Sequence, residues 1–177
     1  MNVVLIGMPG CGKSTVGVLL AKAMQLDFTD SDLLLQRRIG MSLQEYLNRN
    51  GLSSFLQAEE ETLCSLSEKE CVIATGGSAV YSEAGMTHLK RSAVTVYLSL
   101  PLESVEKRLT DIKTRGVAMG EGQSIADLYA QRTPLYERYA DIVVDADGQS
   151  VEETVQAVWE KVRDFSFAEE GKGRQAL

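Results

Sequence analysis

Cysteine and histidine are scarce in this chain of 177 residues, which contains three cysteines and one histidine. Cys11, Cys64 and Cys71 are too few and too widely spaced for a disulfide scaffold or a cysteine-based zinc site. His88 stands alone, which excludes a histidine-based metal cluster. Cys11 lies inside a glycine-rich turn, and we interpret it as a small residue at a variable position rather than as a reactive thiol.

Long apolar runs and an excess of positive charge are also absent. No run approaches the ~20 apolar residues that a membrane-spanning helix needs, and the N-terminus lacks the basic start of a secretory signal. The formal net charge of −7 argues against nucleic acid as the main partner, because binding to a phosphate backbone needs a basic surface. We therefore expect a monomeric cytoplasmic protein with no nucleic-acid partner and no membrane partner.

Strand-like and helical patterns alternate along the chain, as in α/β domains built on a parallel sheet. The segments with strand character are 2–7 (NVVLIG), 27–32 (DFTDSD), 71–77 (CVIATGG), 93–100 (AVTVYLSL) and 141–145 (DIVVD). Apolar residues recur at helical spacing in 13–25, 33–67, about 105–112, 125–140 and from 150 onward. The stretch 113–124 is rich in glycine and predicts a mobile loop. We expect one domain over 1–164 and a flexible tail over 165–177.

Residues 7–14, GMPGCGKS, match the pattern G-x-x-x-x-G-K-[ST] between a buried strand and an amphipathic helix. Gly10 and Gly12 allow a turn that points successive backbone N–H groups inward, and the helix N-terminus adds about half a positive charge. Lys13 is expected to reach the β- and γ-phosphates of a nucleotide, and the Ser14 hydroxyl to bind Mg²⁺. The nucleotide-binding set expected here is Gly10, Cys11, Gly12, Lys13, Ser14 and Thr15. The motif predicts a P-loop NTPase-type α/β/α sandwich of three layers with a mostly parallel five-stranded sheet.

Two common classes of nucleotide enzyme do not fit. A GTPase would carry an N-K-x-D motif, which is absent, and a motor ATPase would have an apolar strand ending in Asp or Glu, whereas 71–77 ends in ATGG. We therefore expect the carboxylates near the metal to come from Asp30 and Asp32. Carboxylates two residues apart on an extended segment share a face, so both are expected to point toward the phosphates. Asp27 is interpreted as a turn residue.

Taken together, several segments resemble the shikimate kinases over 2–163. The resemblance is carried by GMPGCGKST (7–15), FTDSD (28–32), ATGG (74–77), an arginine in the glycine-rich loop and QRTPLYERYAD (131–141). It implies a kinase that uses ATP and Mg²⁺ to phosphorylate a hydroxyl of a small hydroxy acid, most simply shikimate to shikimate 3-phosphate.

The resemblance also implies roles for the acceptor side of the site. Asp30 would hold Mg²⁺ through water, and Asp32 would bind the acceptor hydroxyl and take its proton. Gly76 and Gly77 would bring backbone amides against the acceptor. Arg132 would pair with the acceptor carboxylate.

On the nucleotide side, the resemblance makes the loop at about 113–124 a lid that carries Arg115. Arg115 would close over the γ-phosphate, where an arginine can contribute about 10³–10⁵ in rate. Arg108 matches the arginine that stacks on adenine in the family, and Gln149 is also assigned to the nucleotide.

Three departures from the family concern the acceptor and the lid. Leu56 stands where the family usually has an arginine that grips the acceptor carboxylate, Ser78 follows two glycines where a third is common, and Arg115 leads into GVAMGEGQ rather than Pro-Leu-Leu. One lost charge-assisted hydrogen bond would weaken shikimate binding by roughly ten- to 150-fold. Arg37 and Arg38 are candidate substitutes, although their spacing equally suits a solvated helix face.

Two other functions therefore stay open on the sequence. One is a related P-loop kinase that acts on another small alcohol, gluconate-like or homoserine-like. The other is a nucleotide-binding regulator without catalysis, against which the presence of Asp32 argues, because a sensor has no need of a base.

Overall fold

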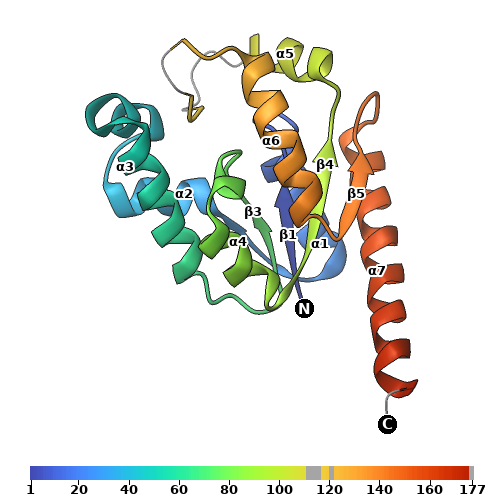
Figure 1. The fold of residues 1–177 in the computed structure, drawn as a ribbon. Coiled ribbons are helices and arrows are strands. Elements are labelled where there is room, and N and C mark those ends of the chain that lie inside the picture. The colour runs from blue at the N-terminus through green and yellow to red at the C-terminus, as the bar shows by residue number, and fades with distance from the viewer. Residues whose placement is uncertain (111–116, 120–121, 176–177) are drawn as a thin grey trace.

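The computed structural model describes residues 1–110, 117–119 and 122–175. Strands and helices alternate as the sequence predicts (Figure 1). Their bounds in chain order are β1 Asn2–Ile6, α1 Lys13–Met24, β2 Asp27–Asp30, α2 Ser31–Ile39, α3 Leu43–Ser65, β3 Cys71–Ala74, the 3₁₀ turn η1 Ala79–Tyr81, α4 Glu83–Lys90, β4 Ala93–Ser99, α5 Leu102–Thr110, α6 Ile125–Tyr139, β5 Ile142–Asp145 and α7 Val151–Gln175.

The strands form one sheet in the order β2-β3-β1-β4-β5, and every neighbouring pair is parallel. Val4 at the centre pairs with Ile73 of β3 on one side and with Thr95 of β4 on the other. Because all strands run in one direction, the segments that leave β1, β2 and β3 meet at the same edge of the sheet, where ligands bind in open α/β folds. The α/β prediction is confirmed.

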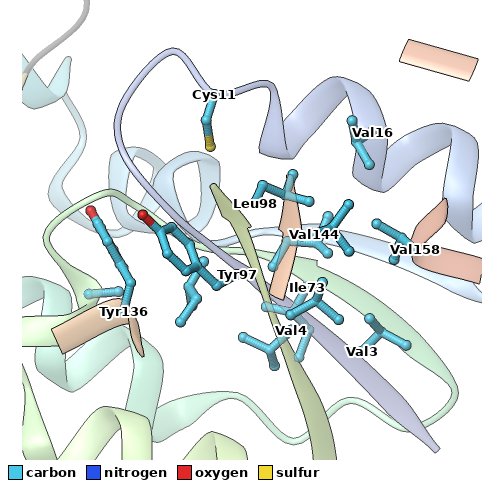
Figure 2. Close-up of a cluster of buried hydrophobic side chains, with 14 of the residues drawn as sticks. Val3, Val4, Cys11, Val16, Ile73, Tyr97, Leu98, Tyr136, Val144 and Val158 are labelled. Atoms are coloured by element: carbon cyan, nitrogen blue, oxygen red, sulfur yellow. The ribbon is translucent and has the colours of Figure 1, made fainter. Parts of the chain in front are cut away.

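Helices cover both faces of this sheet and complete three layers. α1 and α7 pack against each other on one face, and α4 and α6 pack on the other (Figure 1). Both faces of β1 and β3 are therefore buried, which explains why their sequences show no polar alternation. Figure 2 shows the resulting core, in which the rings of Tyr97 and Tyr136 stack with centroids 5.1 Å apart.

A second, smaller apolar cluster joins α2 and α3 beside the edge of the sheet. Leu35, Leu43, Phe55 and Ala118 are buried in it. α3 is bent at Gly51, where φ is 78° and ψ is 171°; glycine adopts such values with little strain. Ala118 comes from the short described stretch 117–119 before α6, so this residue packs onto the α2–α3 pair.

Three details differ from the sequence-based expectation or refine it. Asp32 does not lie on an extended segment, because the chain turns into α2 at Ser31. Glu153 and Ser150 form a capping box at the start of α7, which fixes where the predicted last helix begins. α7 continues to Gln175, so most of the stretch expected to be a flexible tail is helical; its fraying stays a prediction. In the described part of the chain, no helix is both long and apolar enough to cross a membrane.

Candidate active site

The loop between β1 and α1 forms an open nest of backbone amides. Gly10 and Gly12 have φ of 79° and 95°, values that L side chains rarely adopt, which is why these positions need glycine. The Lys13 side chain is buried and folds back over the loop, where its Nζ donates hydrogen bonds to the carbonyl oxygens of Gly7 (2.8 Å) and Met8 (3.0 Å). The loop therefore presents amides and one ammonium group to the carboxyl edge of the sheet.

The first turn of α1 is tied to the start of α2. Ser14 Oγ donates a hydrogen bond to Asp30 Oδ2 at 2.6 Å. The other carboxylate oxygen of Asp30 accepts from the backbone N–H groups of Asp32 (3.0 Å) and Leu33 (3.2 Å), so Asp30 is the N-cap of α2. The cap fixes both the direction of α2 and the position of the Asp32 side chain in its first turn.

Asp32 and Gly76 meet where β2 and β3 end. A Cβ on Gly76 would collide with Glu59 Oε1 and would lie 2.6 Å from Asp32 Oδ1. Only a glycine fits between these two carboxylates. The Gly76 N–H donates to the buried Ser31 Oγ at 3.2 Å, which holds the glycine backbone against α2. The structure thus brings Asp32 and Gly76 together, with Asp32 on a helix rather than on the extended segment expected from the sequence.

Arg132 is fully buried on α6. Its Nε donates to Tyr81 Oη (3.2 Å) and its Nη2 donates to the carbonyl oxygen of Ala118 (2.5 Å), whereas its Nη1 has no hydrogen-bond partner in the described part of the chain. A Cβ on Gly77 would lie 3.2 Å from that Nη1. A buried donor without a partner is costly in a folded protein, so Nη1 marks a place where an anionic or acceptor group of a ligand belongs.

One cavity of about 290 Å³ connects these groups. Its lining comes from the loop after β1, the first turns of α1 and α2, the glycines after β3, the loop before α6, and α6 itself. The residues are Pro9, Gly10, Gly12, Lys13, Ser14, Thr15, Asp32, Phe55, Thr75, Gly76, Gly77, Ser78, Val117, Ala118 and Arg132. The amide nest and Lys13 therefore share a single space with Asp32 and Arg132.

Other predicted residues lie outside this lining. Cys11 is buried and points from the loop toward the core (Figure 2). Arg108 is half-buried on α5, and its Cβ would be 3.6 Å from a Cβ on Gly10, so it flanks the phosphate loop. Gln149 is exposed between β5 and α7. Arg115 lies outside the described residues, and its role stays a prediction.

The two candidate replacements for the missing arginine are not part of the cavity. Arg38 pairs with Glu61 at 2.7 Å, and both side chains are about half exposed. Arg37 is exposed on the same helix. The solvated-face interpretation of these arginines is therefore the better one. Leu56 does not line the main cavity either; it lines a smaller one next to it.

Glu59 was not foreseen from the sequence. It is 3% exposed, its Oε1 has no hydrogen-bond partner, and desolvation by burial raises its pKa from 4.5 to about 7. The negative charge of Asp32 raises this pKa further, whereas a hydrogen bond from Ser78 and the charges of Arg132 and Lys13 lower it. A signal did exist: Glu59 shares the helical spacing of Phe55, Thr62 and Leu63, which form the buried face of α3.

The side chains present fit Mg²⁺ bound together with a nucleotide. In the described part of the chain, no group of three or more His, Cys, Asp or Glu residues could hold a metal by itself. Mg²⁺ commonly keeps several waters and is bound through one or two carboxylates plus the phosphates of the substrate. The hydroxyl of Ser14 and the carboxylate of Asp30, in contact beside the amide nest, form such a partial ligand set.

The fold and this site together define the class of P-loop phosphotransferases, in which an amide nest opens onto an acceptor pocket. A family model described as shikimate kinase matches residues 9–163. The shikimate kinase of Alteromonas mediterranea is 34% identical over 91% of this chain and 96% of its own length. That of Thermodesulfovibrio yellowstonii is 33% identical over 97% of this chain and 98% of its own.

Solved structures agree with the sequence relatives. The shikimate kinase of Acinetobacter baumannii, in complex with shikimate, has a TM-score of 0.85 at 30% identity and covers 92% of this chain and 93% of its own. The structure from Aquifex aeolicus has a TM-score of 0.81 at 32% identity, covering 94% and 98%. This chain belongs to the shikimate kinase family and is a kinase with an alcohol group as acceptor.

Proposed function

We propose that this protein transfers the γ-phosphoryl group of ATP to a hydroxyl of shikimate, giving shikimate 3-phosphate. The observation that carries the proposal is the shared cavity, which brings Lys13 and Ser14 of the phosphate loop together with Asp32 and Arg132. The shikimate complex of the Acinetobacter baumannii relative supports the choice of acceptor, because the two chains align over nearly their whole lengths. The relatives do not favour a gluconate-like or homoserine-like acceptor, or a regulator without catalysis.

On the nucleotide side, the amides of the loop bind the phosphates of ATP. Lys13 leaves the carbonyls of Gly7 and Met8 and pairs with the β- and γ-phosphates. Ser14 and Asp30 would hold Mg²⁺, which would supply neutralisation of the phosphate charge. Arg108, packed beside the loop, contacts the adenine, and Gln149 lies further out along the nucleotide.

On the acceptor side, Arg132 Nη1 donates to the acceptor carboxylate, and the backbone of Gly76 and Gly77 forms the floor under the ring. Asp32 accepts a hydrogen bond from the reacting hydroxyl and takes its proton as the oxygen attacks the γ-phosphorus, while the bond from that phosphorus to the β–γ bridging oxygen breaks and ADP leaves. The transition state of phosphoryl transfer is loose, so positioning of the hydroxyl contributes more than the strength of the base. The expected monomeric state and cytoplasmic location remain predictions.

The test is a coupled assay of ADP release with shikimate, gluconate and homoserine as acceptors, followed by identification of the product by ³¹P NMR. Turnover with shikimate and a phosphate monoester as the product are expected. Asp32→Asn should reduce kcat by about 10²–10⁴, the usual contribution of a positioned general base. Asp27→Asn is the matched control, because Asp27 is exposed at the start of β2, the strand that leads into the helix of Asp32.

Turnover of gluconate or homoserine in preference to shikimate would overturn the assigned acceptor. Unchanged turnover in Asp32→Asn would show instead that Asp32 is not the base. The absence of turnover with any alcohol, in a protein that still binds Mg·ATP by calorimetry, would support the regulator.

A further inference from the structure

A second cavity of about 170 Å³ lies between α3 and η1, next to the main one. It is lined by Leu56, Gln57, Glu59, Glu60, Ser78, Tyr81 and Ser82. Ser78 lines both cavities, and Glu59 stands between them, because it lines the smaller cavity while its Oε1 reaches Gly76 of the larger. Gln57 is exposed and Tyr81 is 37% exposed, so the smaller cavity is reached from solvent.

The charges around this cavity are not balanced. Among the described residues, two carboxylates line it, Glu59 and Glu60, and no lysine or arginine does. Glu60 Oε2 accepts from Ser82 Oγ at 2.6 Å, so this carboxylate has a partner. Glu61, the next residue, pairs with Arg38. Glu59 is the most buried of the three and retains an oxygen with no partner.

The position of Leu56 explains the imbalance. Leu56 is three residues before Glu59 and four before Glu60 on α3, the spacing at which helical side chains face each other. A cationic side chain at that position would pair with these carboxylates within the helix. Leucine offers no donor, so among the described residues Glu59 Oε1 is left without a hydrogen-bond partner beside a cavity that Leu56 helps to line.

We propose that this cavity binds a small organic cation that carries N–H donors, a guanidinium or primary alkylammonium group, with Glu59 as its anionic partner. A buried carboxylate is costly unless it is paired and hydrogen-bonded, and an N–H cation supplies both. The apolar walls formed by Leu56 and Tyr81 suit a short alkyl chain. Because one water takes about 30 Å³ in the liquid, the cavity holds a group of only a few heavy atoms.

The site has a consequence for the main cavity. A cation at Glu59 lies behind Ser78, on the wall that the two cavities share. It adds positive charge near the space where Arg132 Nη1 is the unpartnered donor. The bound cation should therefore lower the KM for an anionic acceptor and leave the KM for ATP unchanged. This part of the inference rests on the proposed function, whereas binding of the cation does not.

Binding is tested on the full chain without nucleotide or acceptor, by calorimetry and thermal unfolding. The probes are methylguanidinium and n-propylammonium chloride at millimolar concentration. Urea is the neutral control of similar shape, tetramethylammonium is the cation without N–H donors, and NaCl matches the ionic strength. Saturable binding of one cation per chain is expected, with Tm raised by about 3–6 °C at ten times Kd. The three controls should leave Tm unchanged.

Variants locate the site. Leu56→Arg should abolish the shift, because its guanidinium fills the cavity and pairs with Glu59, whereas Leu56→Met should keep it. Glu59→Gln should also abolish it, and circular dichroism checks that each variant is folded. If wild type shows no saturable shift beyond NaCl, or if Leu56→Arg binds the probes as wild type does, the proposal is overturned. Either result leaves ATP-dependent turnover untouched, so it is distinguishable from a failure of the proposed function.

Discussion

Ser14 and Asp30 are sixteen residues apart in the chain, and the hydrogen bond of 2.6 Å between their side chains joins the phosphate loop to the helix that carries Asp32. The same carboxylate caps that helix through the N–H groups of Asp32 and Leu33. Asp30 thus contacts the phosphate loop and caps α2, and in the proposed function its charge also helps to bind Mg²⁺. The cap and the charge can be separated by a substitution that keeps the first and removes the second.

Asp30→Asn is that substitution. Asparagine caps helices about as well as aspartate, so the free energy of unfolding should change by less than about 1 kcal/mol. The loss of a carboxylate that orients the metal site should cost about 10–100-fold in activity, with a higher Mg²⁺ concentration needed for half-maximal rate. Steady-state assays over a range of Mg²⁺, with urea unfolding of the same samples, make the measurement. An equal loss in Asp27→Asn would point to a nonspecific charge effect.

Arg132→Lys should act on the acceptor. Lysine keeps the charge but cannot make the contacts to Tyr81 and Ala118 and also reach the cavity. The KM for shikimate should rise by roughly ten- to 150-fold, the value of a lost charge-assisted hydrogen bond, with little change in the KM for ATP. Arg138→Lys, exposed on the same helix, is the control. A change confined to ATP would contradict the role given to Arg132.

Glu59 predicts a pH dependence of stability. Its pKa of about 7 lies above the ordinary 4.5, so between these values the native state binds this proton more tightly than the unfolded chain does. Stability contributed by Glu59 is therefore present below about pH 4.5 and is lost as pH rises through about 7, by about 3 kcal/mol in total.

The measurement is urea unfolding of wild type and Glu59→Gln at about pH 5 and about pH 8. Glutamine does not titrate, so the stability of wild type relative to this variant should fall as pH rises. Glu60→Gln is the control, since Glu60 has a hydroxyl partner and is less buried. A difference between wild type and Glu59→Gln that stays constant with pH would mean that Glu59 is ionised at both pH values.

Arg115→Ala tests the lid. An arginine that contacts the transferring phosphoryl group stabilises the transition state more than the bound ATP. kcat should therefore fall, by up to about 10³–10⁵-fold, while the Kd for Mg·ATP from calorimetry changes little. Lys113→Ala, two residues away, is the comparison. Equal losses in kcat and in ATP affinity would assign Arg115 to ground-state binding.

The phosphate loop and the sheet could be predicted from sequence because their signals are local. The glycine pattern of 7–14 requires its backbone shape whatever surrounds it, and the unbroken apolar runs at 2–6 and 71–74 indicate strands covered on both faces. The grouping of Asp32, Gly76 and Arg132 came from the resemblance to a family. No local pattern relates α2, the end of β3 and α6.

Two features of the site could be recognised only in the folded structure. Asp32 was expected on an extended segment, but the capping bonds of Asp30 begin a helix at Ser31, and no alternation rule reveals that turn. The partner of a buried carboxylate such as Glu59 depends on which elements pack against it. Spacing along α3 could have indicated that Glu59 is buried, but not that its Oε1 has no hydrogen-bond partner among the described residues.

Tyr136 follows Arg132 by one helical turn, and its hydroxyl donates to the carbonyl oxygen of Gly77 at 2.6 Å. Burial raises the pKa of Tyr136 far above its ordinary value, so it remains a donor at any physiological pH. This bond joins α6 to the backbone of Gly76 and Gly77, so a mutation on the inner side of α6 should shift both the helix and these glycines. Substitutions that change the acceptor are less constrained on α3, because Leu56 and Gln57 line a cavity rather than a packed interface.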